Sequence, residues 1–89
     1  MQYENIAQLI GRTPLLELCG YEKKEGLTAR IFAKLEYFNP TGSVKDRAAL
    51  YILDAAERGG RLKAGGTGIG PPSGNTGIGL AALCAVRGY

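Results

Sequence analysis

The sequence predicts an α/β fold, and three features of its 89 residues support this class. Segments 13–18 and 29–38 have the composition or the alternating pattern of short strands. Segments 44–58 and 76–87 have apolar residues at helical spacing, and each follows a turn of small residues. Because strand-like and helix-like segments alternate along the chain, we expect a parallel sheet with flanking helices.

The N-terminal half is expected to be mostly extended. A short helical turn over 4–10 ends at Gly11, and 13–18 follows as a strand. Residues 20–28 are polar and interrupted by glycine, which predicts a loop. The strand over 29–38 alternates apolar with charged side chains, as a strand with one wetter face does. The N-P-T-G sequence after it predicts a turn.

Two helices are expected in the C-terminal half. The first, 44–58, is stopped by a pair of glycines, and Ser43 is placed to cap its start. Asp46, three residues after Ser43, resembles the second arm of a capping box. A glycine-weakened strand over 67–70 then precedes the second helix, 76–87. The apolar stripe of the first helix consists of Val44, Ala48, Tyr51, Ile52 and Ala55.

Composition excludes several classes of function. The net charge of +3 comes from scattered Lys and Arg, without a basic stripe, so we expect no nucleic-acid partner. No apolar run reaches the roughly 20 residues that span a bilayer, and the N-terminus lacks the pattern of a signal peptide. We therefore expect a cytoplasmic protein with no membrane partner. With no histidine, no metal site is expected, and Cys19 and Cys84 are interpreted as packing residues.

The sequence P-S-G-N-T-G-I-G forms a small-residue turn that opens into the second helix. The free N–H groups of a helix start favour anions. Ser73, Asn75 and Thr76 add side-chain donors, while Gly74 and Gly77 let a ligand approach the backbone. The turn is therefore interpreted as a site for a carboxylate or a phosphate. The alternative from the residues alone is a plain capped helix with tight glycine packing.

Lys45 occupies the start of the first helix, where the helix dipole opposes its positive charge by about 0.3–1 kcal/mol. With further help from burial, such an amine suits a Schiff base with an aldehyde cofactor. The alternative is a solvated lysine paired with Asp46 or Glu36. The residues by themselves favour this alternative.

Two motifs together carry a resemblance to a known family. N-P-T-G-S-V-K-D-R and P-P-S-G-N-T-G-I-G-L-A resemble the paired signatures of the cysteine synthases (O-acetylserine sulfhydrylases), within the pyridoxal-phosphate β-family of fold type II. The opening I-A-Q-L-I-G-R-T-P-L-L-E-L resembles the same enzymes, so the likeness covers essentially the whole chain. It implies that residues 1–89 are the N-terminal fragment of a catalytic domain, an incomplete sheet whose C-terminal remainder, with its phosphate cradle, is absent.

The resemblance also implies roles for individual residues. Lys45 is the catalytic lysine that forms the Schiff base with pyridoxal 5'-phosphate, and Asn75 binds the phenolic oxygen of this cofactor. The substrate carboxylate is bound by Ser73, Gly74, Asn75 and Thr76. The implied reaction is β-replacement, in which O-acetylserine and sulfide give cysteine and acetate. By the same resemblance, the full-length enzyme is a homodimer, with serine acetyltransferase as a further partner.

The chain departs from the family pattern before the second helix. It has Gly70 and Pro72 where the family has an apolar strand and a threonine that helps to bind the carboxylate. Two alternatives to cysteine synthase follow. One is a related enzyme of the β-family, such as cystathionine β-synthase or a serine or threonine dehydratase. The other is a non-catalytic truncated fragment, and the 89-residue chain alone is expected to be inactive.

Overall fold

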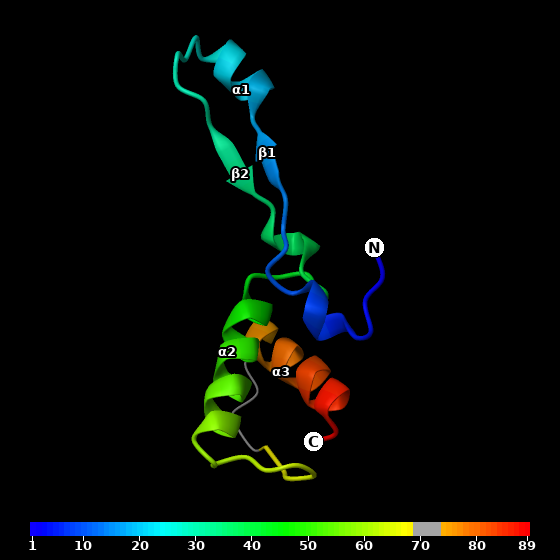
Figure 1. Cartoon of the computed structure of the whole chain (residues 1–89). Helices are drawn as coiled ribbons and strands as arrows, with labels where there is room; N and C mark the ends of the chain where they lie inside the picture. Colours follow the sequence, from blue (N-terminus) through cyan, green and yellow to red (C-terminus); the bar gives the residue numbers. More distant parts are fainter. Residues whose placement is uncertain (69–73) are drawn as a thin grey trace.

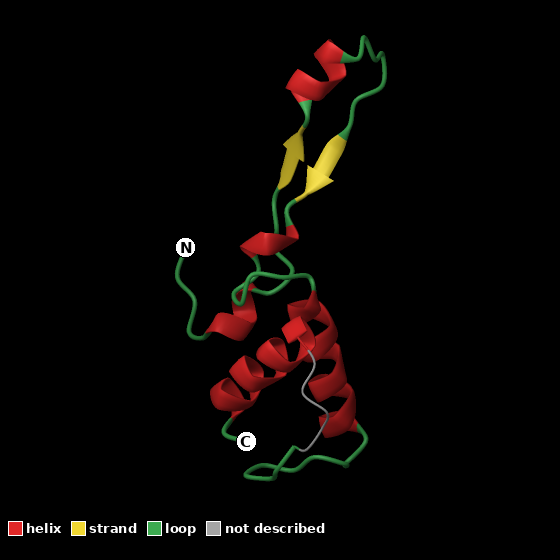
Figure 2. Ribbon diagram, turned by 180° about the vertical axis from the view of Figure 1, so that it is seen from behind, coloured by secondary structure: helices red, strands yellow, loops and turns green. Residues whose placement is uncertain are grey.

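The chain, seen in a computed structural model that describes residues 1–68 and 74–89, consists of a projecting hairpin and a pair of packed helices (Figure 1; Figure 2). Its principal extents are 55 × 32 × 20 Å. The elements in chain order are the 3-10 helix η1 (Ile6–Leu9), β1 (Leu15–Glu17), α1 (Cys19–Lys24), β2 (Phe32–Lys34), the 3-10 helix η2 (Glu36–Phe38), α2 (Lys45–Arg58) and α3 (Gly74–Arg87).

The two strands of the described residues pair antiparallel, which corrects the parallel sheet expected from the alternation of elements. Backbone hydrogen bonds extend the ladder at both ends, from Leu35 N to Pro14 O (3.0 Å) and from Leu18 N to Ile31 O (2.9 Å). The chain turns back because α1 lies beyond the strand tips and does not cross the sheet, as a parallel connection requires (Figure 1). The register pairs Leu15 with Lys34, Leu16 with Ala33 and Glu17 with Phe32.

Helix α1 replaces the first part of the loop predicted over 20–28, so that prediction is wrong for 20–24, whereas 25–28 are in no helix or strand. Its first turn is closed by Glu22 N, which donates to Leu18 O (3.0 Å). Across the hairpin, the carboxylate of Glu22 accepts a hydrogen bond from Ile31 N (2.6 Å). This contact between distant residues supports the helix, and a polar segment interrupted by glycine gives no sign of it.

The second strand is shorter than predicted because η2 replaces its C-terminal end. The buried side-chain amide of Asn39 donates to the backbone oxygen of Glu36 (2.8 Å), which stabilises the bend. The turn predicted over 39–42 is confirmed. Gly42 N donates to Asn39 O (2.8 Å), and Gly42 has a φ of 91°, where glycine is favoured. The short helical turn predicted over 4–10 is likewise confirmed as η1.

Helix α2 confirms the helix predicted over 44–58, and it begins at Lys45. The hydroxyl of Ser43 accepts a hydrogen bond from Lys45 N (3.1 Å), so Ser43 does bind the helix start. The predicted capping box is wrong. The carboxylate of Asp46 accepts hydrogen bonds from Thr41 instead of reaching back to the N–H of Ser43.

The apolar stripe predicted for α2 is also wrong. The buried residues of this helix are Asp46, Ala49 and Leu53. Tyr51 and Ile52, which belong to the predicted stripe, are 72% and 50% exposed. The reason is tertiary, because α3 packs against the face that holds Ala49 and Leu53 and leaves the neighbouring face uncovered.

Helices α2 and α3 run side by side in the same direction (Figure 1; Figure 2). Near their starts, a Cβ built on Gly79 would lie 3.1 Å from the Cβ of Ala49. At their centres, Leu53 and Leu83 form the core with Ala49. Near their ends, Arg87 forms ion pairs with two α2 carboxylates, those of Asp54 (2.8 Å) and Glu57. The prediction of a second helix over 76–87 is confirmed, with a start two residues earlier.

Two further predictions concern single segments. Residues 67 and 68 of the weak strand are in no strand, and 69–70 lie outside the described residues. Cys84 is half-buried against the core, as expected, whereas Cys19 is exposed and is not a packing residue. None of the helices in the described ranges combines the length and the apolar character needed to cross a membrane.

The chain is more extended than a compact domain of its size. Its radius of gyration is 17.1 Å, against about 12 Å for a compact chain of this length. Its accessible surface is 6448 Å², against roughly 5,000 Å² for a compact monomer of equal mass. Large apolar residues contribute to this surface, because Leu15, Phe38 and Tyr51 are each more than half exposed.

Candidate active site

The starts of α2 and α3 lie at the same end of the helix pair, the end that faces the hairpin (Figure 1; Figure 2). Lys45 is the first residue of α2, and Asn75 is the second residue of α3. Gly79, one helical turn after Asn75, lies against Asp46 of α2. Two positive dipole ends therefore meet beside Lys45, and free N–H groups of this kind bind anions.

The structure places the predicted residues of the P-S-G-N-T-G turn as follows. Gly74 and Asn75 are exposed at the start of α3, and Thr76 is half-buried in its first turn. Gly74 has a φ of 39°, a left-handed conformation that favours glycine. Ser73, with Gly70 and Pro72, lies outside the described residues.

Lys45 is exposed, and the described residues do not pair it with either of the expected carboxylates. Glu36 forms an ion pair with Arg47 (2.7 Å) instead. Asp46 is occupied by Thr41, whose N–H donates to its Oδ2 (2.8 Å). The alternative of a lysine held in a surface ion pair is therefore wrong for the described part of the chain.

A polar network that the sequence analysis missed is centred on Glu36 and includes Arg47 in the first turn of α2. Arg47 donates two hydrogen bonds to the carboxylate of Glu36, from Nε to Oε1 (2.7 Å) and from Nη2 to Oε2 (3.0 Å). The hydroxyl of Thr13 donates to Glu36 Oε2 (2.7 Å), and the amide of Asn39 donates to Oε1 (3.0 Å). The network ties the start of α2 to the base of the hairpin.

The electrostatics of this network follow from its geometry. The hydrogen bonds from Arg47, supported by those from Thr13 and Asn39, lower the pKa of Glu36 to about 2. The same pair raises the pKa of Arg47. Thr13 and Asn39 are buried polar residues, 7% and 3% exposed. The sequence contains no local signal for the network because its members are separated by up to 34 positions.

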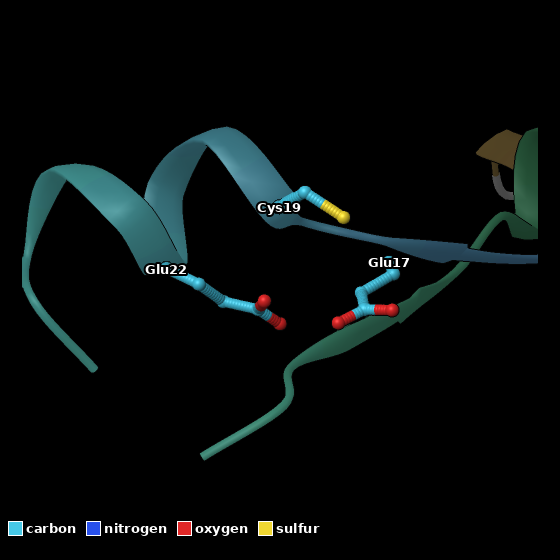
Figure 3. Close-up of side chains that lie close together, drawn as sticks. All are labelled: Glu17, Cys19 and Glu22. Atoms are coloured by element: carbon cyan, nitrogen blue, oxygen red, sulfur yellow. The ribbon is translucent and has the colours of Figure 1, made fainter. Parts of the chain in front are cut away.

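A second cluster lies away from α2, at the outer end of the hairpin. Glu17, Cys19 and Glu22 point toward one another, with ligand-type atoms all within 4.8 Å (Figure 3). Both carboxylates already have partners, because Glu17 pairs with Arg30 (2.9 Å) and Glu22 binds a backbone N–H. The bond from Arg30 lowers the pKa of Glu17. The cluster thus holds the hairpin together, and its only thiol is exposed.

Comparisons with known proteins agree with this arrangement. The sequence profile of a family described as "Pyridoxal-phosphate dependent enzyme" matches residues 6–89. A cysteine synthase of Staphylococcus aureus strain Mu50 is 51% identical over 86 residues, which are 97% of this chain and 27% of that protein. The crystal structure of a cysteine synthase from Entamoeba histolytica superposes with a TM-score of 0.87 at 48% identity, and that of an O-ureido-L-serine synthase with 0.86 at 43%. Each superposition covers all of this chain and 27% of the chain in the crystal structure.

These superpositions show that the chain has the fold of part of a fold type II pyridoxal-phosphate enzyme. The predicted α/β class is therefore confirmed. Because the match covers nearly all of its length, the chain belongs to the pyridoxal-phosphate dependent enzyme family. The resemblance inferred from the two motifs is confirmed, and the chain spans about 27% of the length of the relatives it matches.

The residues present fit one part of such a cofactor and its substrate. Lys45 offers a primary amine without an ion pair in the described ranges, which is the group that reacts with an aldehyde. The N-terminal turn of α3 offers N–H donors for a carboxylate. The described residues therefore offer groups that suit the aldehyde of the cofactor and the carboxylate of the substrate.

Proposed function

We propose that the chain is the N-terminal part, over residues 1–89, of a catalytic domain that makes cysteine from O-acetylserine and sulfide and releases acetate. One observation carries this proposal. Lys45 lies at the meeting point of two helix starts, and both carboxylates that could have paired with it bind other residues. The 51% identity with a cysteine synthase supports this substrate class over others in the family.

In this proposal, Lys45 would hold pyridoxal 5'-phosphate through Nζ, and Asn75 would bind the cofactor through its amide. When bound, the cofactor supplies an electron sink for the charge left on the substrate Cα. The carboxylate of O-acetylserine lies against Ser73, Gly74, Asn75 and Thr76, where the dipole of α3 stabilises it. Nζ of Lys45, released when the amine of O-acetylserine takes its place, would take the proton from Cα as acetate leaves from Cβ. It would return the proton to Cα after sulfide has added at Cβ.

Other properties of the whole protein belong to the same proposal. Residues outside this chain would bury Lys45 and cover the uncovered face of α2, since the described residues leave both exposed. A cytoplasmic homodimer, with serine acetyltransferase as a partner, rests on the resemblance alone. A related enzyme that uses another nucleophile is the second candidate. It is favoured by the likeness to an O-ureido-L-serine synthase and, at a TM-score of 0.82, to a hydrogen sulfide-producing enzyme of Fusobacterium nucleatum.

The test uses a chimera in which this chain replaces the segment that it matches in the Staphylococcus aureus cysteine synthase. Reduction with borohydride in the presence of pyridoxal phosphate, followed by peptide mapping, is expected to place the label on Lys45. Lys45→Ala should abolish both the label and cysteine formation, because no other group there supplies the amine. The matched control is Lys63→Ala, which removes an exposed lysine far along the chain and should change neither. A label on Lys34 or Lys63 would refute the assignment.

A second variant tests the carboxylate site. Asn75→Ala in the chimera should reduce kcat/KM for O-acetylserine by about 10-fold or more, since a hydrogen bond to a charged group contributes roughly 1.5–3 kcal/mol. The control is Ala81→Gly, an exposed position further along α3. Steady-state kinetics with varied O-acetylserine provide the measurement. An unchanged kcat/KM would contradict a carboxylate site at the start of α3 and would favour the alternative of a plain capped helix.

A further inference from the structure

We propose that Asp46 is a positioning residue, which fixes Lys45 relative to the carboxylate-binding start of α3 by clamping the turn before α2. This inference rests on the proposed function and assigns a role to a residue that touches neither cofactor nor substrate. Asp46 follows Lys45 directly in the chain, and it is 1% exposed. Its carboxylate therefore cannot be explained as a solvated surface charge.

The first half of the clamp is the bond to the turn over 39–42. The backbone N–H of Thr41 donates to Asp46 Oδ2 (2.8 Å), and the hydroxyl of Thr41 donates to Oδ1. Both donors come from one residue, and both oxygens of the carboxylate are used. Because a carboxylate is a charged acceptor, both of its bonds to Thr41 are charge-assisted and therefore roughly twice as strong as bonds between neutral groups. An amide could accept from the N–H and donate to the hydroxyl, but without the charge, so an acid at this position gives the stronger clamp.

The second half of the clamp is the contact with α3. A Cβ built on Gly79 would lie 3.0 Å from Oδ1 of Asp46 and 3.1 Å from the Cβ of Ala49. Glycine therefore allows α3 to approach the carboxylate, and a larger residue would push the helices apart. Gly79 is one turn after Asn75, so this contact sets how far Asn75 is from Lys45.

Asp46 thus joins three parts of the site. It holds the turn that leads into α2, it stands in the first turn of the helix that begins with Lys45, and it abuts the helix that begins the carboxylate site. A negative charge in the first turn of a helix is also stabilised by the dipole. Because reacting groups lose about 100-fold in rate when they move by roughly 1 Å, this clamp affects chemistry more than ground-state binding.

The experiment compares variants of the same chimera. Asp46→Asn removes the charge of the acceptor and Thr41→Val removes one of its two donors, so each weakens the clamp, while Thr41→Ser keeps the hydroxyl and should restore it. The control is Asp54→Asn, which removes a carboxylate from the same helix at its other end. We expect Asp46→Asn and Thr41→Val to lower kcat by about 10- to 100-fold, with KM for O-acetylserine changed by less than about threefold. Thr41→Ser and Asp54→Asn should stay within about twofold of the parent.

A readout on the cofactor-free protein separates this proposal from the proposed function. Asp46→Asn should accelerate hydrogen exchange of the Thr41 amide by about 10-fold or more, because the acceptor of this amide loses its charge, without a matching change at the amides of α3. If the parent chimera binds no pyridoxal phosphate at Lys45, the proposed function fails while the exchange result still tests the clamp. Unchanged exchange at Thr41, or a fall in kcat that Thr41→Ser does not restore, would overturn the proposal. A fall in kcat of the same size in Asp54→Asn would also overturn the proposal.

Discussion

At the scale of single residues, the pairing of Glu36 with Arg47 decides what Lys45 is free to do. Arg47 takes up the carboxylate with two hydrogen bonds, and Thr13 and Asn39 complete its coordination. Had Glu36 bound Lys45, the amine would be held as an ammonium ion in a surface pair. The network therefore engages the carboxylate of Glu36 elsewhere and leaves the amine that we propose as the nucleophile unpaired in the described ranges, while it anchors the base of the hairpin.

This network predicts a pH dependence of stability. In the folded chain the pKa of Glu36 is about 2, below its ordinary value of 4.5. A carboxylate with a lowered pKa contributes stability that is fully present above the unfolded value and is lost as pH falls through the folded one. Glu36→Gln should therefore destabilise the chimera at neutral pH, and the difference from the parent should shrink as pH falls from about 4.5 to about 2.

Urea unfolding at several pH values measures this difference. The control is Glu25→Gln, since Glu25 is exposed and forms no ion pair with the described residues. A destabilisation by Glu36→Gln that stays constant down to about pH 2 would show that the ion pair is not its source.

At the scale of elements, the parallel pair α2 and α3 builds the candidate site. Leu53 and Leu83 pack at the centre of the pair, and Arg87 fixes its far end through Asp54 and Glu57. The near end is left with two helix starts side by side. Most short connections make neighbouring helices antiparallel. Here α3 begins beside the start of α2 instead, so the positive ends of both dipoles lie at the same end of the pair.

The core of this pair predicts the effect of a single truncation. Leu83 is 1% exposed, so Leu83→Ala should lower the free energy of unfolding of the chimera by about 2–5 kcal/mol, from lost burial and the cavity left behind. Ile78→Ala, on the same helix but 53% exposed, should cost less than about 1 kcal/mol. Urea unfolding followed by circular dichroism measures both. Equal losses would contradict the packing of Leu83 against Leu53.

At the scale of the whole molecule, the chain leaves apolar surface uncovered. Its radius of gyration and accessible surface both exceed those of a compact domain, and its buried apolar core in the described ranges is only Ala49, Leu53 and Leu83. The hairpin projects from the helices with one antiparallel strand pair and no layer over it (Figure 2). Such a hairpin is marginally stable by itself in water.

The isolated 89-residue chain is therefore expected to lack cysteine synthase activity. The three buried apolar residues of the part that the structure describes give too little stability for an independent fold, and its strand edges and apolar faces favour aggregation. Mixing the chain with pyridoxal phosphate, O-acetylserine and sulfide tests this, with the cofactor alone as background. Cysteine formation above that background, lost on Lys45→Ala, would show that the chain is sufficient for catalysis.

The sequence predicted the elements whose signals are local. The glycine pair after α2 and the N-P-T-G turn were identified correctly, because they depend on residues a few positions apart. Helix α1 was missed because a bond between Glu22 and Ile31 supports it. The predicted stripe of α2 was wrong because α3 covers the face of Ala49 and Leu53 and leaves Tyr51 and Ile52 exposed, a choice that helical spacing alone does not decide.

The sequence by itself determined the family, the two long helices and the place of Lys45 at a helix start, since each of these depends on short motifs and on local conformational preference. Only the tertiary structure decided that the hairpin is antiparallel, which face of α2 is buried, and which residues bind Glu36 and Asp46. Those features depend on contacts between residues that are distant in the chain or that compete for one partner. Composition and residue spacing do not determine which of several possible partners a residue contacts. The packing of the folded chain does.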